Sequence, residues 1–109
     1  MDDNKEFELS IRIAGNTLIP CLQAIRAKGY AISNYFISDT PGEWENHQWD
    51  AEKEGRRFSA TSPEELLGLI SMWEVRGNDW QLKDGEGDLY DNLVESAPMY
   101  DSNGNVIDK

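Results

Sequence analysis

The feature that most constrains the fold of this sequence is a helix start at Ser62-Pro63-Glu64-Glu65. A serine at the N-cap accepts a hydrogen bond from the amide three residues on, proline suits the first helical position, and glutamate at the third completes a capping box. Apolar side chains then recur at helical spacing: Leu66, Leu69, Ile70 and Trp73. Gly77 matches a helix end. The pattern predicts a helix over 63–76 with one apolar stripe that faces a core.

Strand and helix patterns precede this helix. Four apolar residues alternate with polar ones, which is typical of a half-buried strand: Phe7, Leu9, Ile11 and Ile13. Asn16 can cap a helix that ends at Gly29. The apolar stripe of that helix is Leu18, Cys21, Leu22 and Ile25. Strands are predicted over 30–38, 43–51 and 56–60, and a turn at 52–55 joins the last two.

The order of these elements, β-α-β-β-β-α, predicts an α+β fold. We expect a single layer of mixed or antiparallel sheet with about four strands and both amphipathic helices on one face. The first two strands would pair in parallel through a right-handed crossover. A chain of 109 residues is expected to form a single domain over 1–109, with residues 1–6 frayed.

An acidic C-terminal extension, partly ordered, is predicted over 84–109, where seven acidic residues face one lysine. It contains apolar residues for one short helix, around 89–94, and for a small hairpin that pairs Met99-Tyr100 with Val106-Ile107. The whole chain carries 21 Asp and Glu against 10 Lys and Arg, a net charge of −11. That balance disfavours binding to nucleic acid. The sequence shows neither a secretory signal nor an apolar run of membrane-spanning length, so we expect a cytoplasmic protein without membrane contact.

Few residues suit catalysis or metal binding. One cysteine, Cys21, and one histidine, His47, leave no internal disulfide and no zinc cluster, and no phosphate-binding loop is present. We therefore expect no enzyme and no cofactor. Residues 84–95 place oxygen ligands at positions 1, 3, 5, 9 and 12, as in an EF-hand loop, but Leu89 stands where such a loop needs glycine. The sequence predicts no tight calcium site and leaves weak calcium binding at 84–95 open.

The strongest candidates for contact with a partner lie just after the predicted helix and at the start of the acidic extension. Trp80 packs back on the core or, if exposed, anchors a partner. The candidate partner-binding residues are Asp79, Trp80, Asp84, Glu86, Asp88 and Asp91.

Residues 52–70, continuing to Gly77-Asn78-Asp79-Trp80, resemble small uncharacterised acidic bacterial proteins that share the element GRxFSAxSPEELLGL. The resemblance covers about a quarter of the chain and extends loosely to the immunity proteins of interbacterial toxins. It implies a strand-to-helix junction and transfers no catalytic residue.

The expected function is that of a protein-binding module, most concretely an immunity or inhibitor protein that neutralises a basic toxin through an acidic surface. The alternatives are a regulator that binds a metal or a small ligand, a DNA-mimic inhibitor, or a domain whose acidity serves only solubility. The oligomeric state stays open.

Overall fold

The structure is a computed structural model that describes residues 6–108; residues 1–5 and 109, which include most of the stretch expected to be frayed, lie outside it. It has mixed α and β structure, as predicted. The chain separates into two compact units, one up to Asn78 and one from Asp79 onward, and each is described by itself.

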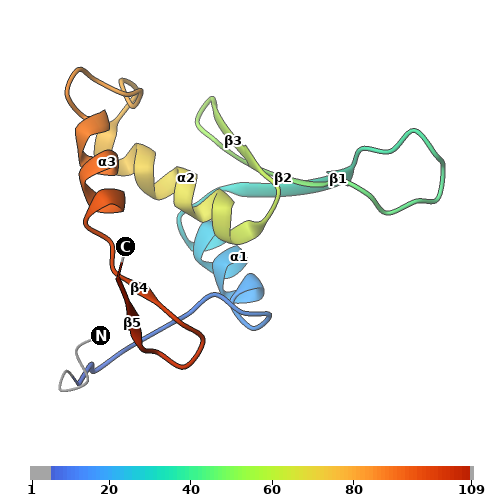
Figure 1. Cartoon of the computed structure of the whole chain (residues 1–109). Helices are drawn as coiled ribbons and strands as arrows, with labels where there is room; N and C mark the ends of the chain where they lie inside the picture. Colours follow the sequence, from blue (N-terminus) through green and yellow to red (C-terminus); the bar gives the residue numbers. More distant parts are fainter. Residues whose placement is uncertain (1–5, 109) are drawn as a thin grey trace. The chain divides into compact units, whose positions relative to one another are not determined.

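The first unit is built around a three-stranded antiparallel sheet with the order β1-β2-β3 (Figure 1). Its elements are α1 (Leu18–Ala27), β1 (Ala31–Phe36), β2 (His47–Lys53), β3 (Arg56–Ala60) and α2 (Pro63–Arg76). The β2–β3 hairpin turns at Glu54 and Gly55, which both have positive φ. This turn and the start of β3 match the prediction.

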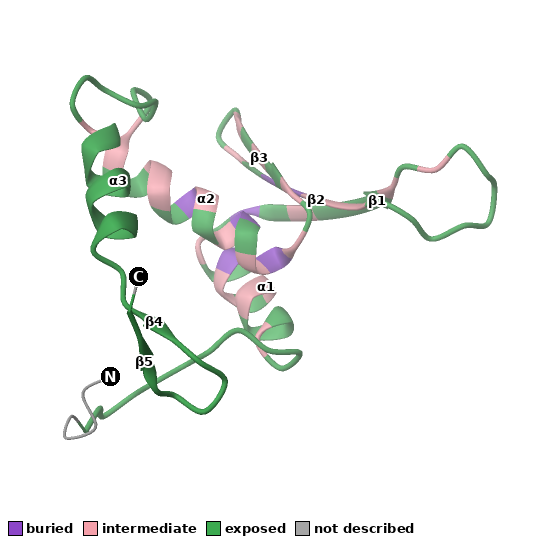
Figure 2. Cartoon of the chain, viewed as in Figure 1, coloured by how far each residue is buried: buried purple, intermediate pink, exposed green. Residues whose placement is uncertain are grey.

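The core lies on one face of this sheet. Ala51 in β2 is opposite Ile32 in β1 and Phe58 in β3, and all three side chains point to the helices. The buried apolar residues are Ile25, Tyr30, Ala51, Leu66 and Ile70 (Figure 2). Both helices contribute to this cluster, and the expectation that they cover one face is confirmed.

Helix α2 has the predicted bounds and the predicted cap. Ser62 is extended, its Oγ accepts a hydrogen bond from the Glu65 amide at 3.1 Å, and the same hydroxyl donates to Glu65 Oε1 at 2.9 Å. Gly77 ends the helix with φ +78°, a conformation that side chains with a Cβ adopt at a cost. The local signals therefore locate both ends of this helix.

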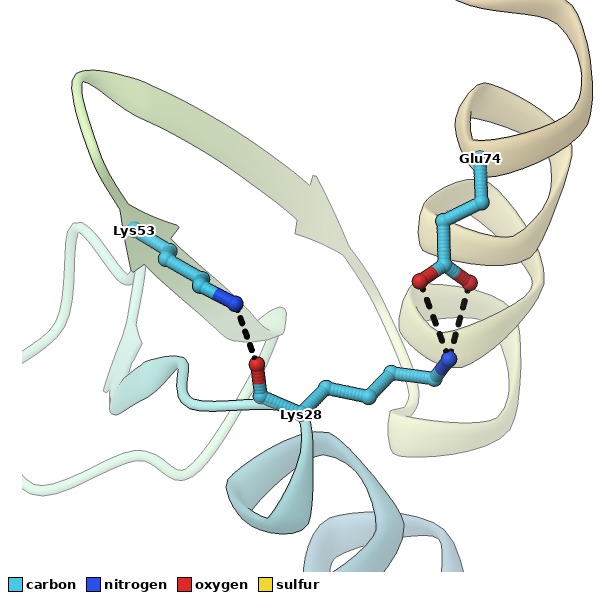
Figure 3. A network of polar contacts seen from close by, with 3 residues as sticks. All are labelled: Lys28, Lys53 and Glu74. Carbon is cyan, nitrogen blue, oxygen red and sulfur yellow. Dashed lines mark hydrogen bonds and ion pairs between the residues drawn. The ribbon is translucent and has the colours of Figure 1, made fainter.

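Two lysines connect the end of α1 to α2 and to β2 (Figure 3). Lys28 Nζ lies 2.8 and 3.0 Å from the carboxylate oxygens of Glu74, and Lys53 Nζ donates to the backbone oxygen of Lys28 at 2.6 Å. Gly29 follows with φ +93°, and a Cβ there would lie 3.2 Å from Lys53 Nζ. The chain can thus turn sharply from α1 into β1 beneath the Lys53 side chain.

The predicted first strand is wrong. Residues 7–13 form no strand, and their apolar side chains, from Phe7 to Ile13, are 71–74% exposed. An alternating pattern yields a strand only where a sheet edge accepts its backbone hydrogen bonds, and these residues pair with none in the described chain. The expected parallel pairing of residues 7–13 with β1 is therefore also wrong, because the first of these two strands does not form. The strands that do form, β1, β2 and β3, all pair antiparallel. The N-cap of α1 is Thr17 rather than Asn16.

The second unit contains α3 (Gly87–Glu95) and a small antiparallel hairpin, β4 (Met99–Tyr100) with β5 (Val106–Ile107). The sequence had offered both elements as possibilities. Asp101 Oδ1 holds the hairpin turn by accepting the amides of Asn103 and Asn105, each at 2.9 Å. The backbone hydrogen bond from Asn105, followed by further bonds in the turn, lowers the pKa of the Asp101 carboxyl.

Candidate partner-binding surface

The six candidate partner-binding residues all lie in the second unit. Asp79 and Trp80 precede its helix, Asp84 is in the turn before α3, and Glu86 is the N-cap. Asp88 and Asp91 are on the helix itself. Five of the six side chains are exposed and Glu86 is half-buried, so all six are at least partly accessible to a partner.

Lys83 organises the turn before α3. Its backbone amide donates to Glu86 Oε1 at 2.7 Å, and its Nζ donates to the Asp79 backbone oxygen at 2.7 Å. The ammonium group also lies 3.8 Å from Asp79 Oδ2. Lys83 is the only Lys or Arg among residues 79–108, so the one cation of this segment is engaged in the segment's own turn.

The sequence did not indicate how exposed the apolar residues of this unit are. Helix α3 carries four large apolar side chains that are 55–72% exposed: Leu89, Tyr90, Leu93 and Val94. The hairpin adds the exposed Met99, Tyr100, Val106 and Ile107. Figure 2 shows α3, β4 and β5 as exposed throughout. Apolar side chains that recur along one helix and stay uncovered are typical of an interaction surface.

The stretch with EF-hand spacing is helical. Gly87 to Glu95 belong to α3, so the oxygen ligands at the later positions lie along a helix and do not wrap around an ion. In the part of the chain that the structure describes, no group of three or more His, Cys, Asp or Glu side chains is arranged to hold a metal ion. Within those same residues, no helix is long and apolar enough to cross a membrane.

Cys21 and His47 are both held in local contacts of the first unit. Cys21 is half-buried, and burial, with a smaller effect of the Glu64 carboxylate, raises the pKa of its thiol. A raised pKa reduces the thiolate fraction that reacts as a nucleophile. His47 Nε2 lies 3.1 Å from Asn34 Oδ1, and the imidazole stacks on Phe36.

A row of four aromatic rings follows β1 and β2 toward the loop between them. It consists of Trp49, His47, Phe36 and Trp44, and we call it the aromatic row. Its ring centroids are 4.6 Å apart between Trp49 and His47, 4.1 Å between His47 and Phe36, and 4.9 Å between Phe36 and Trp44. Trp49 packs against the core, whereas Trp44 is 79% exposed.

The aromatic row was missed in the sequence. Side chains alternate between the two faces of a strand, and Trp44 and Trp49 stand an odd number of positions apart. The sequence therefore shows only that the two side chains cannot lie on one face of an uninterrupted strand. The structure resolves this by beginning β2 at His47, which leaves Trp44 in the loop. The useful signal in the sequence was the position of Trp44 between two acidic residues, Glu43 and Glu45.

Comparisons with protein-family models, curated proteins and solved structures find no match to this chain.

Proposed function

We propose that this protein is a non-enzymatic binding module whose second unit engages a basic protein. The most concrete form of the proposal is an immunity or inhibitor protein that neutralises a basic toxin in the cytoplasm, without a cofactor. The resemblance of residues 52–70 to small acidic bacterial proteins is in keeping with this role.

The observation that carries the proposal is the exposure of the second unit. Every residue over 79–108 is exposed except the half-buried Glu86. This segment has eight acidic residues and one basic residue. A basic partner would cover the apolar side chains of α3 and bring cations to the surrounding carboxylates.

The two kinds of side chain would act at different steps of binding. Carboxylates on the rim of an interface attract a cationic partner over distances of about 8 Å at physiological ionic strength and so speed association. Apolar anchors at the centre, here Leu89 and Leu93, exclude water and slow dissociation. If the partner is a nuclease, the same acidic surface would repel nucleic acid from the occupied groove.

The test measures binding kinetics with a basic partner captured from the extract of the cell that makes this protein. A variant with Asp84→Asn, Glu86→Gln, Asp88→Asn and Asp91→Asn is compared with a control that loses the same charge in the first unit. The control changes Glu6, Glu8, Glu52 and Glu54 to glutamine, all of them exposed. We expect the first variant to lower the association rate well beyond the control, with a smaller effect on dissociation.

A second pair of variants tests the apolar part of the surface. Leu89→Ser and Leu93→Ser should raise the dissociation rate while association changes little. The proposal is wrong if the association rate changes neither with salt concentration nor in the variant with four amide substitutions. It is also wrong if the extract yields no basic partner. Either result would leave solubility as the explanation of the charge.

A further inference from the structure

A second surface, in the first unit, has the composition of a binding site for cations. It lies where β1 and β2 run out beyond the two helices into the loop of residues 37–46 (Figure 1). We infer that the exposed indole of Trp44, supported by Phe36, forms a platform for an arginine or lysine side chain of a basic protein segment. This inference goes beyond the proposed function, since it assigns a separate site on the other unit.

The two rings meet almost at a right angle. The planes of Phe36 and Trp44 are 83° apart, with their centroids 4.9 Å from each other, while His47 stacks on Phe36 with an interplanar angle of 19°. Phe36 is therefore held between His47 and Trp44 and gives the indole a fixed neighbour. Because Trp44 keeps most of its surface in solvent, a side chain from another protein can reach it.

The loop that carries Trp44 is closed by its own hydrogen bonds. Ile37 and Asn46 pair at its base, with the Ile37 amide donating to the Asn46 oxygen at 3.2 Å and Asn46 Nδ2 donating to the Ile37 oxygen at 3.2 Å. Nearer the tip, the Glu43 amide donates to the Thr40 oxygen at 3.2 Å. An aromatic anchor on such a loop loses less conformational freedom on binding than one on an open chain.

Charge determines which ligand suits these rings. The loop of residues 37–46 contains no lysine and no arginine, but it contains three carboxylates: Asp39, Glu43 and Glu45. Two of the three flank Trp44 in the sequence. Anionic ligands, nucleic acid included, would be repelled, whereas a cation gains both from the carboxylates and from the negative face of an aromatic ring.

An arginine fits this site better than a lysine. Its planar guanidinium can stack on an indole and at the same time donate two hydrogen bonds to a carboxylate. The first unit already contains one contact between an arginine and an indole: the Arg56 guanidinium lies 4.4 Å from the centre of the Trp73 ring. We therefore expect a capped hexa-arginine peptide to bind more tightly than hexa-lysine.

The test titrates hexa-arginine into the full chain labelled with ¹⁵N and follows the indole N–H signals, which Trp→Phe variants assign. The Trp44 signal should shift on addition of hexa-arginine and stay fixed with hexa-glutamate. Trp44→Ala should weaken binding about three- to fivefold, the effect of one exposed cation–π contact. Trp44→Phe should bind the peptide with an affinity between those of Trp44→Ala and the unchanged chain. Ile19→Ala, which truncates another exposed apolar side chain, is the matched control.

The results separate this inference from the proposed function. If the Trp44 signal stays fixed, or Trp44→Ala binds as tightly as the Ile19→Ala control, the inference is wrong. The inference is also wrong if peptide binding is weakened only by the variant with four amide substitutions in the second unit, although the proposed function then stands. If Trp44→Ala weakens binding of the peptide while the four amides leave the natural partner's association rate unchanged, this site stands and the proposed function fails.

Discussion

Replacing Leu66 with alanine tests whether one apolar face of the sheet holds the first unit together. Leu66 lies in the first turn of α2, is completely buried, and shares the core with Ile25, Ala51 and Ile70. All four have no exposed surface. A core this small has few other side chains that can move to fill the space left by a truncation, so the variant should lose most of the contacts that leucine made.

The expected loss of stability follows from the atoms removed. Leucine has three carbons more than alanine, and each buried carbon group is worth about 0.8 kcal/mol, which gives about 2.4 kcal/mol. The cavity adds to this, so we expect a loss of about 3 kcal/mol in the free energy of unfolding, within the usual range of about 2–5 kcal/mol. That corresponds to a change of roughly 150-fold in the unfolding equilibrium. For a domain of this size, the melting temperature should fall by about 12–24 °C.

The measurement is urea denaturation followed by far-ultraviolet circular dichroism. Val75→Ala, on the same helix but at a side chain that is 87% exposed, is the control and should change stability by no more than about 0.5 kcal/mol. The slope of the transition should be unchanged in Leu66→Ala, because the surface exposed on unfolding is nearly the same. If the two variants unfold at the same urea concentration, Leu66 is not in the core and the reasoning is refuted.

Three further predictions concern single groups. Ser62→Ala should cost about 1 kcal/mol through the lost helix cap, and an unchanged urea midpoint would show that this hydroxyl caps nothing. The raised pKa of the Cys21 thiol should make it react more slowly with iodoacetamide at pH 8 in the folded chain than in urea; equal rates would contradict this. The pKa of Asp101 in the folded chain lies below the ordinary value of 3.8. The hydrogen bonds that its carboxylate accepts in the turn are therefore fully present above pH 3.8, and they are lost as the pH falls through the lower pKa of the folded chain. Amide shifts of the turn should report that loss, and Asp101→Asn should abolish the pH dependence.

The elements that were predictable are those whose signals are local. The cap at Ser62, the apolar spacing of the next residues and the glycine at position 77 act within one or two helical turns, and α2 runs over the predicted 63–76. The turn before β3 and the hairpin of β4 and β5 were predictable for the same reason, since a few turn residues set their backbone angles.

The acidic residues of the second unit were recognised from composition, but the character of the surface around them was not. Leu89, Leu93 and Val94 were correctly assigned to a helix. An amphipathic pattern says that one side of a helix is apolar, but not whether that side is covered. In the structure it is exposed, which turns an acidic segment into a surface with apolar anchors as well.

Residues 7–13 show most clearly what the sequence could not decide. By itself the sequence determined α2, the β2–β3 turn and an excess of negative charge, and it offered the short helix and the hairpin of the second unit only as possibilities. Tertiary structure decided that the alternating residues 7–13 stay unpaired and that Phe36, Trp44, His47 and Trp49 meet in one row. The physical reason is that caps, turns and helical periodicity depend on near neighbours in the chain. Strand pairing, burial and ring stacking depend on residues that only the folded chain brings together.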